Sequence, residues 1–198
     1  MGRNAFIIGI TGKIATGKDT VSQIIASQYG FHEINTDKIG HIILQEEKDK
    51  VIKLFGNTIL NNINEIDRIK LRNIVFYNKE KLQTLEKIIH PIIYNRIEQI
   101  ISTNKFEKII INAALLFKLN LAKFCNHIFI IKANDEIIKK RLRLNRNLDE
   151  NLISNILKWQ KDIFSNKNII NSKITNIINN KSYGYLERKI KAKMSEVT

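Results

Sequence analysis

The chain has 198 residues, of which 43% are hydrophobic and 26% are charged, an ordinary globular composition that excludes a wholly disordered chain. This length fits one domain with a sizeable core. The single cysteine, Cys125, excludes an intrachain disulfide and a cysteine-based zinc site. No run approaches the roughly 20 apolar residues of a membrane span, and the first residues do not read as a signal peptide, so we expect a cytoplasmic protein with no membrane partner.

The charge balance is 33 Lys and Arg against 19 Asp and Glu, a formal net charge of +14. A basic chain of this kind either binds a polyanion, such as a nucleotide or nucleic acid, or carries a lysine-rich background composition. We favour the second interpretation, because lysine, asparagine and isoleucine recur along the whole chain, as in residues 166–182. We therefore expect no nucleic-acid partner, and the oligomeric state stays open.

Apolar runs and breaker residues predict the elements in chain order. Residues 5–10 predict a buried strand, residues 18–29 a helix and residues 31–34 a second strand. Residues 38–103 predict mostly helix, with breaks at Gly56 and before Pro91. The remaining predicted elements are a strand at 108–112, a helix at 115–124, a strand at 127–132, helices from about 135 and at about 149–164, a short strand near Ile169 and Ile170, and a terminal helix from about 183.

Strands that alternate with helices predict an α/β fold, with a parallel sheet covered by helices on both faces. The long helical segment 38–103 reads as an insertion at one edge of that sheet. The sequence shows no internal repeat and no linker rich in Pro, Gly or Ser. We therefore predict a single domain over residues 1–198.

The strongest motif is GKIATGK, between the first predicted strand and helix. It matches the P-loop pattern G-x-x-x-x-G-K, in which glycines let backbone N–H groups approach phosphate oxygens and the lysine reaches the β- and γ-phosphates. The alternative, a strand–helix turn without a ligand, is disfavoured by this context. The candidate phosphate-binding residues are Gly12, Lys13, Ile14, Ala15, Thr16, Gly17, Lys18, Asp19 and Thr20.

The position after the P-loop lysine usually carries Ser or Thr, whose hydroxyl binds Mg²⁺, but this chain has Asp19 there. A carboxylate can ligate Mg²⁺ directly or through water, and Thr20 supplies the nearest hydroxyl. We therefore predict Asp19 and Thr20 as the Mg²⁺ ligands. The sequence has no Asn-Lys-x-Asp motif for guanine, which favours ATP over GTP.

A set of segments stands in a characteristic order along the chain: Gly9–Lys18, Asn35-Thr36-Asp37, Phe55-Gly56, Asp67–Arg72, Val75-Phe76, Leu85–Pro91, Leu115-Leu116-Phe117, Arg141-Leu142 and Gln160. Through these segments the chain resembles one family, the dephospho-CoA kinases, over residues 5 to about 188. The resemblance implies a P-loop kinase fold with a helical insertion and lid. It also implies ATP and dephospho-CoA as substrates, with phosphoryl transfer to the ribose 3′-hydroxyl in the last step of coenzyme A synthesis.

The resemblance also implies catalytic roles. Asp37 would face the acceptor hydroxyl as general base or orienter, although the sequence equally allows a helix N-cap there. Lys18 would hold the transferring phosphoryl group. Arg141 would stabilise charge that builds up on it, the alternative being a solvated helix face in KKRLRLNR, residues 139–146.

The predicted insertion, residues 38–103, would bind the acceptor through Asp37 at its border and through Arg68 and His90. His90 could instead simply order the chain before Pro91. The predicted lid, residues 139–165, would close over ATP and exclude water.

The sequence departs from the family pattern at several positions. Lys13 and Ala15 replace loop glycines, and Asn145 replaces a second lid arginine, so Arg141, Arg143 and Arg146 are all candidates for the phosphate contact. Asn171-Ser172 is aligned with an Asp-Asn pair on the adenine side. These departures leave open two rivals, another small P-loop nucleotide or nucleoside kinase and a non-catalytic nucleotide-binding regulator.

Overall fold

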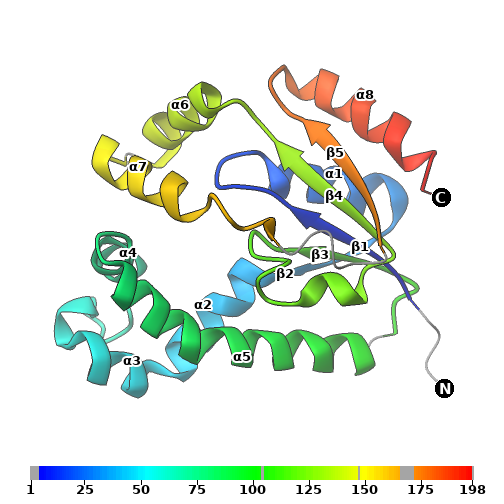
Figure 1. The fold of residues 1–198 in the computed structure, drawn as a ribbon. Helices are drawn as coiled ribbons and strands as arrows, with labels where there is room; N and C mark the ends of the chain where they lie inside the picture. Colours follow the sequence, from blue (N-terminus) through cyan, green and yellow to red (C-terminus); the bar gives the residue numbers. More distant parts are fainter. Residues whose placement is uncertain (1–4, 104, 147, 166–171, 198) are drawn as a thin grey trace.

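The fold is known from a computed structural model that describes residues 5–103, 105–146, 148–165 and 172–197. Its centre is a five-stranded parallel sheet in the order β2-β3-β1-β4-β5 (Figure 1). The strands are β1 (Phe6–Thr11), β2 (His32–Asn35), β3 (Lys108–Asn112), β4 (His127–Lys132) and β5 (Lys173–Ile178). The predicted α/β fold with a parallel sheet is confirmed.

The central strands are nearly continuous apolar runs because helices cover both of their faces. On one face lie α1 (Lys18–Tyr29) and α8 (Tyr183–Met194), packed on Ile8, Ile10 and Phe129. On the other face the long helix α5 (Lys79–Thr103) and the segment after β3 pack on Ile109 and Ile111. The sheet is thus the middle of three layers, with its core on both sides.

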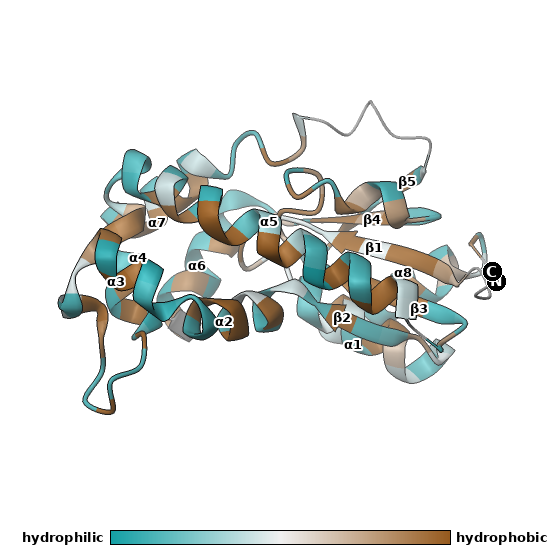
Figure 2. Cartoon of the chain, turned by 90° about the horizontal axis from the view of Figure 1, so that it is seen from below, coloured by the Kyte–Doolittle hydropathy of each residue, from teal (hydrophilic) through white to brown (hydrophobic). Residues whose placement is uncertain are grey.

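The helical segment between β2 and β3 lies to one side of the sheet (Figure 1). Figure 2 shows α5 crossing the view, its turns alternating between hydrophobic and hydrophilic colours. A separate apolar cluster holds α3 to α4, with Val51, Ile59 and Leu71 buried at its centre. Besides α5, the helices here are α2 (Thr36–Glu46), α3 (Lys48–Phe55), the 3₁₀ turn η1 (Asn57–Ile59) and α4 (Arg68–Phe76).

The predicted break before Pro91 is wrong, because α5 continues through it. Proline removes one backbone hydrogen bond from a helix and crowds the preceding turn. That cost is offset by burial, since Ile89, Ile93 and Ile97 on either side of Pro91 all enter the core. The predicted break at Gly56 is confirmed, and Gly56 takes a positive φ of 77° as α3 ends.

The predicted helix over 115–124 is also wrong. The chain there makes a series of turns, followed by the 3₁₀ turn η2 (Leu121–Phe124). Asn120 takes a left-handed conformation with φ 53°, which ends regular α-helix geometry. The apolar residues Leu116, Phe117 and Leu121 are nevertheless buried, so their spacing reflects the core rather than a helix.

After β4 the chain forms α6 (Asp135–Arg146) and α7 (Glu150–Trp159), which share an apolar cluster of their own. The second of these helices ends earlier than predicted, and turns follow up to Ser165. The strand predicted near Ile169 and Ile170 falls outside the described residues. The strand that the structure describes is β5, just beyond that pair.

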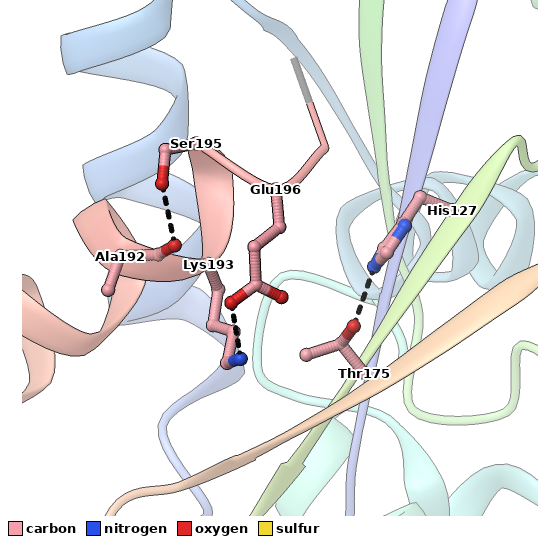
Figure 3. A network of polar contacts seen from close by, with 6 residues as sticks. All are labelled: His127, Thr175, Ala192, Lys193, Ser195 and Glu196. Carbon is pink, nitrogen blue, oxygen red and sulfur yellow. Dashed lines mark hydrogen bonds and ion pairs between the residues drawn. The ribbon is translucent and has the colours of Figure 1, made fainter.

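A polar network lies at the amino end of the sheet (Figure 3). Nε2 of the buried His127 lies 2.9 Å from Oγ1 of Thr175 across β4 and β5. Lys193 and Glu196 form an ion pair of 2.6 Å where α8 ends. Because β1 carries the phosphate loop at its carboxyl end, this network lies away from the loop and contributes to the packing of the C-terminus. Among the described residues, no helix is long and apolar enough to span a membrane.

Candidate active site

The phosphate loop connects β1 to α1 at the carboxyl end of the sheet. The strands on either side of β1 are β3 and β4, so the loop lies where the strand order reverses, the usual ligand-binding crevice of such sheets. Within the loop, Oγ1 of Thr16 donates to the carbonyl oxygen of Lys13 over 2.8 Å, and Nζ of Lys18 donates to the same oxygen over 3.5 Å. The Lys18 side chain is therefore folded back along the loop and is largely buried.

Two loop glycines are required by close contacts. A Cβ on Gly12 would lie 2.4 Å from the carbonyl oxygen of Ile131. A Cβ on Gly17 would lie 2.3 Å from Nδ2 of Asn179, and Gly17 also has a φ of 95° that favours glycine. Ala15, where a glycine was expected, takes a left-handed φ of 57°. The loop keeps its shape despite this strain because other segments hold its backbone.

Three side chains from distant segments hold the loop backbone. Gln160, just after α7, accepts from the N–H of Ile14 over 2.8 Å. Asn179, just after β5, is buried and donates to the carbonyl oxygen of Thr16 over 2.8 Å. Arg141 on α6 donates to the carbonyl oxygens of Ala15 and Asn179, over 3.0 and 3.2 Å. Contacts within the protein thus hold the loop backbone at three points.

Arg141 is partly buried, and this burial lowers the pKa of its guanidinium from the usual value. The alternative of a solvated helix face is therefore wrong for this residue. Arg143 is exposed and forms an ion pair with Glu150. Arg146 is the last residue of α6, and its side chain lies outside the described part of the chain. Among the lid arginines whose side chains are described, Arg141 is the one that contacts the loop.

Asp19 stands at the start of α1 and faces a second polar group. Nδ2 of Asn112, at the end of β3, donates to Oδ1 of Asp19 over 2.8 Å and to Oε1 of Glu33 over 2.9 Å. Ser22 donates to the same glutamate oxygen over 2.5 Å. By donating to both, the Asn112 amide allows the carboxylates of Asp19 and Glu33 to lie close together. Asp19 and Thr20 also lie on the wall of the cavity described below.

Asp37 is exposed in the first turn of α2. The N-cap of that helix is Asn35, whose side chain accepts from the N–H groups of Asp37 and Lys38, each over 3.1 Å. The alternative that Asp37 itself caps the helix is therefore wrong. Its carboxylate is free of that task and faces the cavity in front of the phosphate loop.

A large cavity of about 1470 Å³ lies between the loop, the sheet, α5 and the α6–α7 pair. We call it the large cavity. Lys18, Asp37 and Arg141, predicted from separate parts of the sequence, all line it. Its walls also carry Asp19, Thr20, His90, Glu86, Lys118, Trp159, Gln160, Asn179 and Lys181.

His90 lines the large cavity from α5, and Pro91 follows it inside the same helix, so His90 does not order a turn there. Burial lowers the pKa of His90 from its usual value; Glu86 raises it and Lys118 lowers it. The Lys118–Glu86 ion pair measures 2.6 Å. His90 thus lies next to the ion pair of Glu86 and Lys118.

A second cavity of about 520 Å³, called here the small cavity, opens between α2, α4 and α5. Arg68 lines the small cavity and is absent from the lining of the large one. Asp37, His90, Glu86 and Ile14 line both cavities. The structure therefore brings Lys18, Asp37, His90 and Arg141 together on the wall of the large cavity. Arg68 lies on the wall of the small cavity, and Asp37 lies at the boundary between the two.

Two further polar residues at the site, Asn112 and Asn179, were not predicted from the sequence. Each follows or ends a strand at the carboxyl edge of the sheet, the position where a parallel sheet collects its functional side chains, so strand ends alone could have indicated them. The alignment of Ser172 with the adenine side is wrong. Its hydroxyl donates to the carbonyl oxygen of Cys125 over 2.6 Å, at the amino end of the sheet. Asn171 lies outside the described residues.

The sheet order, the phosphate loop and the helical cover define the class, a P-loop kinase fold. A crystal structure of a Thermus thermophilus protein shares this fold with a TM-score of 0.74, over 98% of both chains at 23% identity. A profile of the dephospho-CoA kinase family matches residues 6–183. The chain belongs to the dephospho-CoA kinase family.

Individual relatives agree with the profile. The dephospho-CoA kinase of Borreliella burgdorferi is 56% identical over 198 residues, which cover all of this chain and 97% of that protein. The structure of dephospho-CoA kinase from Campylobacter jejuni covers 98% of both chains, with a TM-score of 0.61 and 28% identity. The match thus includes the phosphate loop, the helical segment after β2 and the α6–α7 pair.

Proposed function

We propose that this chain transfers the γ-phosphoryl group of ATP to the ribose 3′-hydroxyl of dephospho-CoA, which makes coenzyme A in the last step of its synthesis. Membership of the dephospho-CoA kinase family supports this overall reaction. The structural observation that supports it is the meeting of Lys18 and Asp37 on the wall of one cavity. Such a cavity can hold a triphosphate at one side and an acceptor hydroxyl at the other.

ATP occupies the large cavity in this proposal. Loop residues 12–17 and the start of α1 surround the phosphates with backbone N–H groups, and Lys18 supplies a positive charge at the transferring group. Asp19 and Thr20 are the proposed Mg²⁺ ligands. A carboxylate and a hydroxyl on the same cavity wall fit the oxygen ligands that Mg²⁺ prefers. When bound, the ion would neutralise phosphate charge.

Asp37 orients the acceptor 3′-hydroxyl toward the phosphoryl group and accepts its proton as bonding to phosphorus proceeds. In a loose transition state the oxygen need not lose its proton early, so orientation contributes more than basicity. The exposed carboxylate at the junction of the two cavities suits this role. Arg68 and His90 are the proposed acceptor contacts on the same side.

Arg141 stabilises the charge that builds up on the transferred group. Its guanidinium lies 3.0 Å from the carbonyl oxygen of Ala15 in the phosphate loop, which supports a role beside the phosphates. We assign acceptor binding to the insertion, residues 38–103, and closure over ATP to the lid, residues 139–165. Closure would exclude water and so prevent ATP hydrolysis in place of transfer.

The proposed setting is the cytoplasm, where both substrates are small polyanions. The net charge of +14 has a local use there, since it favours the encounter with such substrates. Nucleic acid is not part of this proposal. The two rivals are a kinase that acts on another nucleotide or nucleoside and a regulator that binds nucleotide without transfer.

The test is ADP release with ATP and Mg²⁺ in the presence of dephospho-CoA, AMP, CMP, dTMP, adenosine or no acceptor. We expect release with dephospho-CoA alone, and a product whose mass is that of coenzyme A. Release with another acceptor would favour the first rival. ATP binding without release under any condition would favour the regulator.

A further inference from the structure

The end of β3 carries an amide where P-loop proteins commonly have a carboxylate. In those proteins Mg²⁺ is held by the Ser or Thr that follows the loop lysine and by an aspartate that follows an apolar strand. Here Asp19 follows Lys18, and the apolar run of β3 ends at Asn112. Because β3 pairs directly with β1, Asn112 lies beside the strand that leads into the phosphate loop. The two positions thus hold one carboxylate and one neutral side chain, as is usual, but in exchanged order.

Contacts with several elements fix the Asn112 amide. The residue is 3% exposed, and its Nδ2 donates to Oδ1 of Asp19 and to Oε1 of Glu33. Ionised carboxylate oxygens only accept hydrogen bonds, so the amide must turn its NH₂ group toward them. Ser22 donates to the same oxygen of Glu33, and Thr36 donates to the backbone carbonyl oxygen of Asn112 over 3.1 Å. Asn112 is therefore anchored in one orientation and can hold Asp19 in one place.

Asp19, at the other end of this hydrogen bond, is exposed on the wall of the large cavity beside Lys18 and Thr20. An exposed side chain has several staggered rotamers open to it, and a bond to a buried partner selects among them. The contact with Asn112 uses Oδ1, which leaves the second oxygen of the carboxylate to bind a cation. Glu33 is absent from the lining of the large cavity, so Asp19 is the carboxylate of this network that a ligand there can reach.

We propose that Asn112 is a positioning residue for the divalent cation that accompanies ATP. It holds the Asp19 carboxylate in the orientation in which that carboxylate binds the ion, and Glu33 and Ser22 hold the amide in turn. The inference rests on the proposed function for the identity of the ligand, ATP with Mg²⁺. Groups that orient a metal ligand without touching the ion contribute about 10–100-fold to metal affinity.

The test is a double-mutant cycle on Asn112→Ala, Asp19→Asn and the double variant. Calorimetry measures the affinity for ATP with Mg²⁺ and again with EDTA, and the ratio of the two affinities is the contribution of the ion. Each single variant should lower this ratio about tenfold or more. The double variant should lose no more than Asp19→Asn alone, because Asn112 acts through Asp19. ATP affinity in EDTA should stay near wild type in Asn112→Ala, which changes no charge.

Asn126→Ala is the matched control. Oδ1 of Asn126 accepts from the N–H of Ile7 over 2.7 Å, so this asparagine also joins neighbouring segments of the sheet, but at its amino end. Its ratio should equal that of wild type. Asn112→Ser decides the matter if Asn112→Ala does not fold, since a hydroxyl has one hydrogen and cannot donate to both carboxylates.

Three results would overturn the inference: an unchanged ratio in a folded Asn112 variant, an unchanged ratio in Asp19→Asn, or losses that add in the double variant. An equal loss of ATP affinity in EDTA would do the same, because it would show a general distortion of the loop. The proposed function is judged separately, by the formation of coenzyme A. If wild type binds ATP with Mg²⁺ but does not phosphorylate dephospho-CoA, the proposed function fails while the cycle still decides the role of Asn112.

Discussion

The two sides of the candidate active site are built in different ways. On the phosphate side, hydrogen bonds from Arg141, Gln160 and Asn179 hold the loop backbone. On the acceptor side, the helices between β2 and β3 are held mainly by apolar clusters, with cross-links such as the paired hydrogen bonds of Gln45 with the backbone of Ile66. Hydrogen bonds are directional and apolar packing is not. The phosphate side is thus pre-shaped, whereas the acceptor side can adjust around a ligand.

The largest effect should follow from removing the charge on the phosphate side. Lys18→Ala should lower kcat by about 10²–10³-fold, because the charge at the transferring phosphoryl group is lost. Steady-state kinetics with ATP and dephospho-CoA measure the change. Lys191→Ala, an exposed lysine on α8, is the control and should be unaffected. A Lys18 variant within a factor of two of wild type would remove the basis of the P-loop assignment.

On the acceptor side, Asp37→Asn should lower kcat by about 10²-fold and leave KM for ATP nearly unchanged. The thermal midpoint should not change, because Asn35 caps the helix. Asn35→Ala, by contrast, should cost about 1 kcal/mol of stability through loss of the cap. Kinetics and thermal unfolding on the two variants separate chemistry from capping. An unchanged kcat in Asp37→Asn would leave its carboxylate with no role in transfer.

A smaller effect tests whether the phosphate side is pre-shaped. Asn179→Ala removes the bond to the carbonyl of Thr16 and should raise KM for ATP about tenfold, because the loop loses a fixed point. KM for dephospho-CoA should stay the same. Asn180→Ala, which loses bonds to Asn134 instead, should leave both constants near wild type. Equal rises in both KM values would mean that the two sides are not independent.

The smallest effect concerns pH. Burial lowers the pKa of both His41 and His90 below the usual 6.5. Arg68 lowers the pKa of His41 further and Asp37 raises it. Glu86 raises the pKa of His90 and Lys118 lowers it. As pH falls, these two histidines therefore become protonated at a higher pH in the unfolded chain than in the folded chain. Their contribution to stability is present above 6.5 and is lost as pH falls through the folded pKa.

Hydrogen exchange, corrected for intrinsic rates, should show α2 and α5 opening more readily at pH 5.5 than at pH 7.5, with α1 less affected. The double variant His41→Gln, His90→Gln should remove this difference, while His127 in β4, whose pKa is also lowered, remains as a common background. A difference of equal size in the double variant would show that other groups control the acceptor side.

Much of the fold could be predicted because local pattern and tertiary burial agree. The strand ending at Asn112 and the loop around Lys18 follow from an apolar run and from glycine spacing. The edge strand β5 could not be found this way, because Ile177 is its one fully buried residue and polar residues stand between its isoleucines. Helix α5 continues through Pro91, and the signal for this was the four-residue spacing of Ile89, Ile93 and Ile97, which the proline outweighed in the prediction.

The candidate site could be predicted where a short local pattern identifies the residue, as the P-loop pattern does for Lys18. It was less predictable where contacts join segments far apart in sequence. Asn179 and Arg141 meet the loop across 163 and 126 residues. The cap on α2 shows the same limit, since both Asn35 and Asp37 have suitable side chains and only backbone geometry assigns the task to the first.

That division of labour at the start of α2 has a consequence for the cell. Because the cap of the helix does not depend on Asp37, a codon change that gives Asp37→Asn should leave a protein that folds and, through its other contacts, still captures both substrates. Such a protein would lower the free pool of dephospho-CoA without making product. In a strain with a working second copy, it would compete with the active enzyme, and its harm would grow with its expression level.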